Sequence, residues 1–214
     1  MQTAPAQSRL IIAVDGPAAA GKGTLARGLA EALDLPYLDT GLLYRAVARR
    51  MLDAGHDPQS DAEAAARALP ASDLERADLR TPEVDRAASQ VAGQPGVRAA
   101  LLDFQRRFGH ARGAVLDGRD IGTVVFPDAT VKFFLTASLA RRAERRWLQQ
   151  GGQAGDALSR TRRELAARDA ADAARAAAPL RPAADAIAID TDRLDAPAVL
   201  AEALRIVRQR LPQT

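Results

Sequence analysis

The chain has 214 residues, no cysteine, 47% hydrophobic residues and a formal net charge of +3. This composition excludes a disulfide framework and thiolate chemistry, is compatible with a reducing cytoplasm, and provides enough apolar residues for one α/β domain. No apolar run reaches the roughly 18 residues that a membrane span requires, so we expect a cytoplasmic location and no membrane partner.

The first part of the chain alternates strand and helix patterns. Residues 9–14 predict a short buried strand, and residues 22–33 predict a helix with leucines at core spacing. Residues 36–39 predict a second strand, followed by a helix over residues 40–54 with Thr40 at its N-cap.

Residues 56–109 are rich in alanine and are interrupted by prolines, and they contain no convincing strand pattern. We expect a helical insertion here. Buried strands are predicted at residues 114–116 and 131–135, followed by a helix with many arginines over residues 138–150.

Glycines break the pattern within residues 151–155, and a polar helix is expected over residues 157–178. Residues 186–189 predict a last strand and residues 197–211 an amphipathic helix. This alternation predicts a mostly parallel sheet covered by helices on both faces, with ligands at the carboxyl ends of its strands.

A glycine-rich loop is the clearest motif. GPAAAGK, from Gly16 to Lys22, satisfies the GxxxxGK pattern between a predicted strand and a predicted helix. Such a loop lets backbone N–H groups converge on phosphate oxygens, while the lysine reaches the β- and γ-phosphates. The alternative is a plain strand-to-helix turn, which neither the spacing nor the lysine favours. The pattern thus predicts a loop that binds a triphosphate such as ATP. With the two residues after the motif, this loop comprises Gly16, Pro17, Ala18, Ala19, Ala20, Gly21, Lys22, Gly23 and Thr24.

Lysine is rare in this chain, where the only examples are Lys22 and Lys132. Its retention in the glycine loop indicates a need for a compact ammonium group, although chance retention is the simpler alternative. Gly23 stands where the motif usually has Ser or Thr, and Thr24 follows. We expect Mg²⁺ to accompany ATP as the cofactor. Thr24 is the one candidate for a direct metal ligand.

Two polyanions that react with each other need neutralising cations. A phosphate acceptor has a second pKa of about 6, so it is largely dianionic near neutral pH and needs no general base. The histidines, His56 and His110, lie in polar surroundings that favour a solvated role. Guanidinium groups can supply the neutralising charge together with Mg²⁺. The candidates are Arg45, Arg119, Arg142, Arg146, Arg168 and Arg175, and for any single one a solvated helix face is the ordinary alternative.

Six segments, in this order, resemble the bacterial cytidylate kinases over nearly the whole chain. They are DGPAAAGKGT (15–24), LDTGLLYR (38–45), ASQVA (88–92), DGRDIGTVVFPDA (117–129), RDAADAARAAAPL (168–180) and PAADAIAID (182–190). The resemblance implies transfer of the γ-phosphoryl group of ATP to CMP or dCMP by direct in-line displacement.

The resemblance also implies an architecture. It predicts one nucleoside monophosphate kinase domain with a P-loop NTPase-type parallel sheet flanked by helices, a helical NMP-binding insertion and a short lid. The boundaries expected are a core at about 8–40, 110–146 and 180–214, an insertion at about 41–109 and a lid at about 147–165. We expect this domain to act as a monomer.

The site residues follow from the same resemblance, position by position. Those implied to act in catalysis are Lys22, Arg119, Arg146 and Arg175. Those implied to surround the acceptor are Thr40, Arg45, Ser89, Arg98, Arg119, Asp120, Arg168, Asp172 and Arg175.

Each implied residue has a chemical use. Asp120 with Ser89 can accept the exocyclic amine of cytosine, and Arg98 can donate to the ring. Arg45, Arg119 and Arg175 fit an acceptor phosphate, and Arg168 with Asp172 fits the ribose hydroxyls. The structural alternatives are a helix cap for Asp120 and a helix-surface ion pair between Arg168 and Asp172.

Two departures from the family pattern are visible. The segment at about residues 70–78 is shorter than in similar family members, which often carry a small antiparallel sheet there. We therefore expect base selectivity to differ somewhat from that of the family. Residues 169–174 are poorer in arginine, so phosphate neutralisation is expected to depend more on Arg145, Arg146 and Arg175.

Three other functions remain to be weighed. A P-loop kinase for UMP, AMP or a metabolite hydroxyl is the nearest alternative. A GTPase switch is excluded because the chain has no asparagine and therefore no NKxD motif. A nucleic-acid-binding protein is disfavoured, because aromatic residues make up only 4% of the chain and stacking platforms need them.

Overall fold

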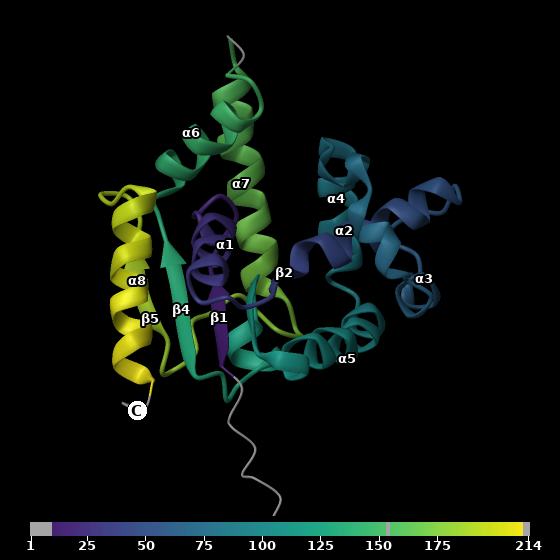
Figure 1. Cartoon of the computed structure of the whole chain (residues 1–214). Coiled ribbons are helices and arrows are strands. Elements are labelled where there is room, and N and C mark those ends of the chain that lie inside the picture. Colours follow the sequence, from purple (N-terminus) through teal and green to yellow (C-terminus); the bar gives the residue numbers. More distant parts are fainter. Residues whose placement is uncertain (1–9, 153–154, 212–214) are drawn as a thin grey trace, which may run out of the picture.

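A five-stranded sheet with strand order β2-β3-β1-β4-β5 lies at the centre of the protein (Figure 1). The computed structural model describes residues 10–152 and 155–211. All neighbouring strands pair in parallel, which confirms the predicted fold class. The strands are β1 (Ile11–Asp15), β2 (Tyr37–Asp39), β3 (Ala114–Gly118), β4 (Val131–Thr136) and β5 (Ile187–Asp190).

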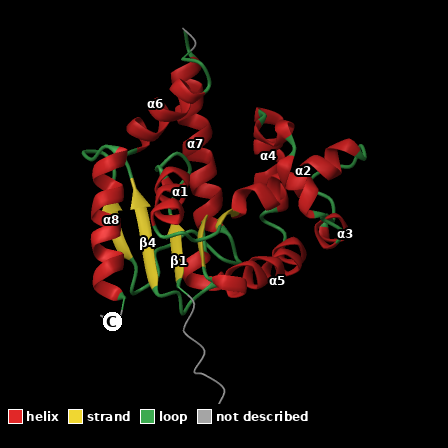
Figure 2. Ribbon diagram, in the orientation of Figure 1, coloured by secondary structure: helices red, strands yellow, loops and turns green. Residues whose placement is uncertain are grey.

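Helices flank this sheet (Figure 2). In the described part of the chain they are α1 (Lys22–Ala32), α2 (Thr40–Asp53), α3 (Glu63–Arg67), α4 (Pro82–Val91), α5 (Pro95–Arg112), α6 (Leu139–Gln149), α7 (Ala157–Ala174) and α8 (Ala196–Arg210). Short 3₁₀ turns, η1 (Ala71–Glu75) and η2 (Ala77–Arg80), precede α4, and one π-helical turn, η3 (Ile121–Val125), follows β3. None of the described helices combines the length and the apolar character that a membrane crossing requires.

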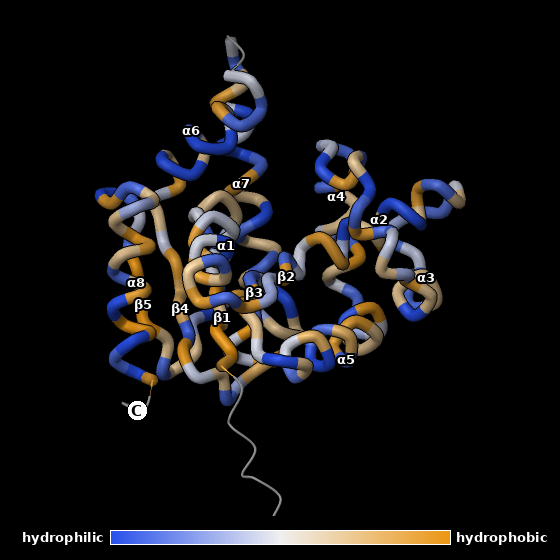
Figure 3. The backbone as a smooth tube through the Cα atoms, in the orientation of Figure 1, coloured by the Kyte–Doolittle hydropathy of each residue, from blue (hydrophilic) through white to orange (hydrophobic). Residues whose placement is uncertain are grey.

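All residues of the central strand β1 are buried. Since successive side chains of a strand point to opposite sides, both faces of β1 are covered. Ile12 and Val14 pack in a core with α1 and α8, whereas Ile11 and Ala13 pack in a second core with α5 and the insertion helices. Hydrophobic residues accordingly concentrate along the central strands in Figure 3. A parallel sheet covered on both faces explains the near-continuous apolar run of this strand.

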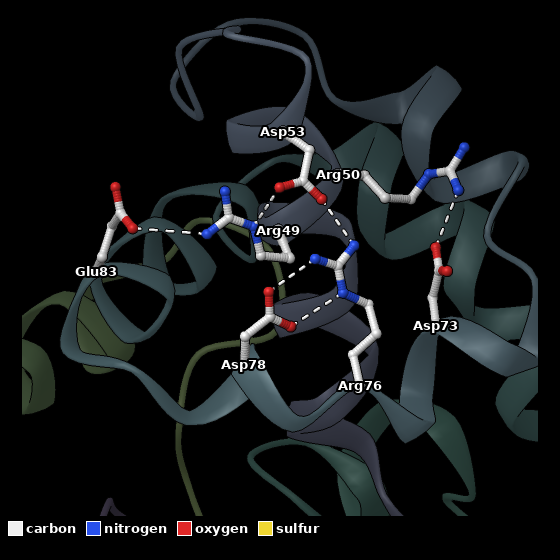
Figure 4. A network of polar contacts seen from close by, with 7 residues as sticks. All are labelled: Arg49, Arg50, Asp53, Asp73, Arg76, Asp78 and Glu83. Atoms are coloured by element: carbon white, nitrogen blue, oxygen red, sulfur yellow. Dashed lines mark hydrogen bonds and ion pairs between the residues drawn. The ribbon is translucent and has the colours of Figure 1, made fainter.

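The region expected to be a helical insertion contains α2, α3, α4 and α5, with the 3₁₀ turns between them. Ion pairs fix these turns to α2 (Figure 4). Arg76 contacts both Asp53 and Asp78, each at 2.7 Å, and Arg50 contacts Asp73 at 2.9 Å. The network therefore organises a segment that has few apolar residues of its own.

Some predicted boundaries need correction. The N-cap residue of α2 is Asp39, not Thr40 as predicted. The Thr40 hydroxyl instead donates a hydrogen bond to the backbone O of Asp117 at 2.8 Å. Helix α7 ends at Ala174, four residues before its predicted end, because the backbone becomes extended at Arg175. Residues 8–9 and 212–214 of the expected core and residues 153–154 of the expected lid lie outside the described residues.

Candidate active site

A cleft of about 230 Å³ lies at the carboxyl ends of β1, β2 and β3, the edge where an open parallel sheet is expected to bind ligands. The residues predicted from the sequence that line it are Ala18, Ala19, Gly21, Lys22, Gly23, Thr24, Thr40, Arg45, Ser89, Arg98, Arg119, Asp120, Arg146, Arg168, Asp172 and Arg175. The predicted loop residues that do not line it are Gly16, Pro17 and Ala20. Segments far apart in the sequence thus converge on one cavity.

The glycine loop fits closely against the sheet. A Cβ at Gly16 would lie 2.3 Å from the backbone O of Leu135 in β4, so a larger residue would displace the loop. Gly21 caps α1 with a φ of 92°, a left-handed conformation that glycine adopts without strain. The loop therefore presents the N-terminal end of α1 to the cleft, where a helix favours anions.

Lys22 is a buried cation at the start of α1, with 6% of its surface exposed. Its Nζ donates to the backbone O of Pro17 at 2.9 Å. Burial, followed by the positive charge of Arg119, lowers the pKa of Lys22 to about 7, against the opposing effect of Asp117. The ammonium group lacks sufficient negative charge around it, which a bound polyanion would supply.

Two buried carboxylates end the central strands. Asp15 accepts hydrogen bonds from the backbone N–H groups of Ile121 and Gly122, at 2.8 and 2.7 Å, and so fixes the turn after β3. Asp117 accepts from the Tyr37 hydroxyl at 2.7 Å. Burial is the largest cause that raises the pKa of Asp15 and the pKa of Asp117, each to about 6. Asp15 therefore holds the backbone beneath the cleft, and Asp117, which lines the cleft, holds the Tyr37 side chain.

Three cleft residues beside these strand ends were missed by the sequence analysis. Asp39 and Asp117 are register partners at the ends of β2 and β3, and Arg80 of η2 contacts Asp39 at 2.9 Å. The signal for the aspartates was available, because each of them ends a predicted strand or stands one position after it. Arg80 had no such signal, since its contact joins segments of the chain that are far apart in sequence.

Asp172 organises part of the arginine cluster. Its side chain is only 1% exposed and contacts Arg119 at 2.9 Å and Arg175 at 2.5 Å. Arg168 is partly buried, and its Nε is inaccessible to solvent and has no hydrogen-bond partner among the described residues. Burial lowers the pKa of Arg168 to about 10, helped by the charge of Arg119, so the group stays protonated at neutral pH. The alternative of an Arg168–Asp172 pair on a helix surface is wrong, because Asp172 is buried and pairs with other arginines.

Arg98 and Asp120 form a second buried pair, with side chains 11% and 7% exposed. The Arg98 guanidinium lies 5.5 Å from the centre of the Tyr44 ring and also donates to the backbone O of Ala92 at 3.2 Å. Asp120 precedes the η3 turn but makes no capping hydrogen bond with its side chain. The alternative of a helix cap is therefore correct in position, since Asp120 is the N-cap residue of η3, but wrong as to a capping contact by its side chain.

A third carboxylate, Asp85 of α4, was also missed. It contacts Arg45 of α2 at 2.8 Å and pairs with Arg146 of α6. Burial alone would raise the pKa of Asp85, but the charges of Arg45 and Arg146 lower it below its usual range. A sequence signal existed, because Asp85 stands four residues before Ser89, which was predicted to contact the acceptor. The two residues therefore share one face of α4.

Other candidate arginines serve the framework. Arg142 donates to the backbone O of Ala18 at 3.3 Å and contacts Asp169 at 2.7 Å, so it supports the glycine loop from behind. Arg145 donates to Thr191 Oγ1 at 2.8 Å and does not line the cleft, so its expected part in neutralising phosphate is not supported. The histidines, His56 and His110, are exposed, as the solvated role predicts.

A parallel sheet of this strand order, with a GxxxxGK loop between β1 and α1, defines a P-loop kinase. The chain resembles in fold a gluconokinase from Sinorhizobium meliloti, with a TM-score of 0.51 and 16% identity over 94% of this chain and 93% of that one. It also resembles an uncharacterized protein from Eubacterium ventriosum, with a TM-score of 0.56 and 14% identity over 94% and 99% of the two chains.

The sequence comparisons are more specific than the fold. A family model described as cytidylate kinase matches residues 12–209. The chain is 65% identical to a cytidylate kinase of Acidiphilium cryptum over 87% of this chain and 90% of that protein. It is 61% identical to a cytidylate kinase of Granulibacter bethesdensis over 96% and 100% of the two chains. The chain belongs to the cytidylate kinase family.

Proposed function

We propose that the protein transfers the γ-phosphoryl group of ATP to CMP or dCMP, giving ADP and CDP or dCDP. The observation that carries this proposal is a single cleft with the glycine loop at one side and a cluster of arginines at the other. No histidine lines this cleft among the described residues, and the chain has no cysteine. Direct transfer between two bound nucleotides therefore fits better than a phospho-enzyme.

The triphosphate side of the cleft is assigned to the glycine loop. Lys22 neutralises the β- and γ-phosphates, and the N-terminal end of α1 adds favourable backbone dipoles. No group of three or more His, Cys, Asp or Glu able to hold a metal occurs in the described residues. The oxygen donors near the loop, Thr24, Asp39 and Asp117, nevertheless suit Mg²⁺, which prefers oxygen ligands and keeps several waters. When bound with ATP, Mg²⁺ offsets phosphate charge.

The acceptor phosphate is assigned to the arginines. Arg45, Arg119, Arg168 and Arg175 surround this part of the cleft, and Arg146 approaches it from α6. Their fixed positive charges stabilise the charge that develops on the transferred phosphoryl group, without any proton transfer by the protein. The unpartnered Nε of Arg168 supports this assignment, since a buried donor without a partner suits an anionic ligand.

The base and sugar are assigned to the remaining cleft residues. Asp120 with Ser89 accepts the cytosine amine and Arg98 donates to the ring. Asp172 Oδ1 is buried and makes an ion pair but no hydrogen bond, so it can accept a ribose hydroxyl beside Arg168. Use of the 3′-hydroxyl alone would allow dCMP as well as CMP.

A panel of acceptors tests this proposal. With ATP and Mg²⁺, CMP and dCMP should be phosphorylated with kcat/KM about 100-fold above UMP or AMP, because the wrong base leaves buried polar groups unpaired. Asp120→Asn should reduce the CMP rate and bring the ratio of CMP to UMP closer to one. A preference for UMP, AMP or a metabolite hydroxyl in the unmodified protein would assign it to another acceptor class.

Proton uptake provides a second test. The pKa of Lys22, lowered to about 7 by burial, should rise when a triphosphate binds, because the polyanion favours the protonated amine. At pH 8 the free protein holds Lys22 mostly neutral, so ATP binding should take up about one proton; at pH 6 the lysine already carries its proton. Calorimetry in buffers of different ionisation enthalpy measures this uptake. Lys22→Ala should abolish it at pH 8, and an unchanged uptake would assign it to another group.

The division of labour within the chain is part of the same proposal. Residues from about 41 to 109 form the acceptor-binding insertion, residues from about 147 to 165 form the lid, and the core spans about 8–40, 110–146 and 180–214. We expect the reaction in the cytoplasm, a monomer as the working unit and no nucleic-acid partner.

A further inference from the structure

One carboxylate joins two arginines that come from different parts of the protein. Asp85 belongs to α4, whereas its partners Arg45 and Arg146 belong to α2 and α6. The side chains of Asp85 and Arg45 are 12% and 13% exposed, and that of Arg146 is 31% exposed. Among the described residues, the contact between Asp85 and Arg146 is the ion pair that connects α4 with α6. The two helices themselves stand apart in Figure 1.

This arrangement has a parallel within the same cleft. Asp172 holds Arg119 and Arg175, and Asp85 holds Arg45 and Arg146. Without negative charge between them, crowded guanidinium groups repel one another and spread apart. A buried carboxylate that accepts from two arginines fixes both, because charge-assisted contacts to a forked group restrict its orientation.

The atoms in contact leave room for a ligand. Arg45 uses its Nε towards Asp85, so neither of its terminal nitrogens is committed to that contact. Arg45 and Arg146 both line the cleft, whereas Asp85 does not. Asp85 therefore touches the two arginines from the side away from the cavity.

We propose that Asp85 is a positioning residue for phosphoryl transfer: its carboxylate links Arg45 and Arg146 and holds both guanidinium groups at the acceptor phosphate. The inference rests on the proposed function. By joining α4 to α6, Asp85 also couples the acceptor-binding insertion to the segment that carries Arg146. The lowered pKa of Asp85 keeps the carboxylate ionised at neutral pH.

A nearby ion pair provides a matched control. Asp73 contacts Arg50 of the same helix α2 at 2.9 Å, and its side chain is 19% exposed (Figure 4). Neither residue lines the cleft. Asp85→Asn and Asp73→Asn thus each remove one negative charge that pairs with an arginine of α2. Only the arginine partner of Asp85 lines the cleft.

The kinetic test compares these variants with ATP and CMP. Asp85→Asn should lower kcat about tenfold and raise the KM for CMP about tenfold, with the KM for ATP changed less than about twofold. Asp85→Glu should restore part of the loss, and Asp73→Asn should change each constant by less than about twofold. In an Arg146→Gln background, Asp85→Asn should reduce kcat much less than it does alone, because the link is already broken. Unaltered constants in Asp85→Asn, or equal losses in Asp73→Asn, would overturn the proposal.

A distance measurement tests the link without any activity. Because the chain has no cysteine, Arg86→Cys on α4 and Leu148→Cys on α6, both at exposed positions, introduce the only labelling sites. In nucleotide-free protein, the distribution of distances between two spin labels should be narrow and should broaden with Asp85→Asn but not with Asp73→Asn. Equal distributions in all proteins would overturn the link. Absence of CMP phosphorylation in the unmodified protein would reject the proposed function. The distance measurement would still show whether Asp85 links α4 to α6.

Discussion

Lys22→Ala should lower kcat about a thousandfold. The reason is that an ammonium group held in place beside the transferred phosphoryl group stabilises the transition state more than the ground state. The fold should survive. Lys22 is buried at a cost, as the lowering of its pKa to about 7 indicates, and its ammonium group donates to the backbone O of Pro17 at 2.9 Å. Steady-state kinetics with ATP and CMP, together with a thermal melt, measure both effects.

The second lysine gives the matched control. Lys132 is also 6% exposed, but its ammonium contacts Asp185 at 2.9 Å and the backbone O of Pro127, outside the cleft. Lys132→Ala should lower the melting temperature and leave kcat within about threefold of the unmodified protein. Normal turnover in Lys22→Ala would reject the role assigned to the glycine-loop lysine.

Arg119→Ala should have the next largest effect, a loss of about 100-fold in kcat/KM for CMP. Arg119 contacts Asp172 at 2.9 Å, and its charge influences the pKa of both Lys22 and Arg168. This position is the one expected of a residue between the two proposed phosphate subsites. Arg119→Lys should recover little, because an ammonium cannot reproduce the planar fork that contacts a carboxylate and a phosphate together.

Initial rates at varied CMP and fixed saturating ATP measure this loss. Arg50→Ala is the comparison, since Arg50 forms an ion pair with Asp73 but does not line the cleft. Its kcat/KM should stay within about twofold of the unmodified protein. An equal loss in both variants would show that the loss does not depend on a cleft residue and would contradict the assignment of Arg119.

Local patterns predicted much of the fold. The buried run ending at Asp15, the glycine loop and the leucines of α1 are contiguous in sequence, so periodicity and glycine spacing suffice to place them. The same patterns placed Asp117 one position after a predicted strand. The polar helical region before α5 was harder, because 3₁₀ turns held by ion pairs leave no regular hydrophobic period.

The contacts within the site could not be predicted in the same way. The Thr40 hydroxyl lies at the start of a helix, where an N-cap is the local expectation, but its acceptor is Asp117, 77 positions away. Asp85 and Arg146 are 61 positions apart, and only the folded arrangement of the chain around the cleft brings their side chains together. Arg142 and Arg146 occupy one helix at a spacing of four, yet one supports the glycine loop and the other lines the cleft.

The central claim is that one cleft carries a phosphoryl group directly from ATP to a cytosine nucleotide. A rapid-quench single turnover tests it most directly, with enzyme in excess over ATP labelled at the γ-phosphate and with CMP and Mg²⁺ present. The account predicts that the label passes from ATP to CDP at the rate at which ADP forms, with none attached to protein. Label that appears on the protein, or as free phosphate whether or not CMP is present, would contradict it.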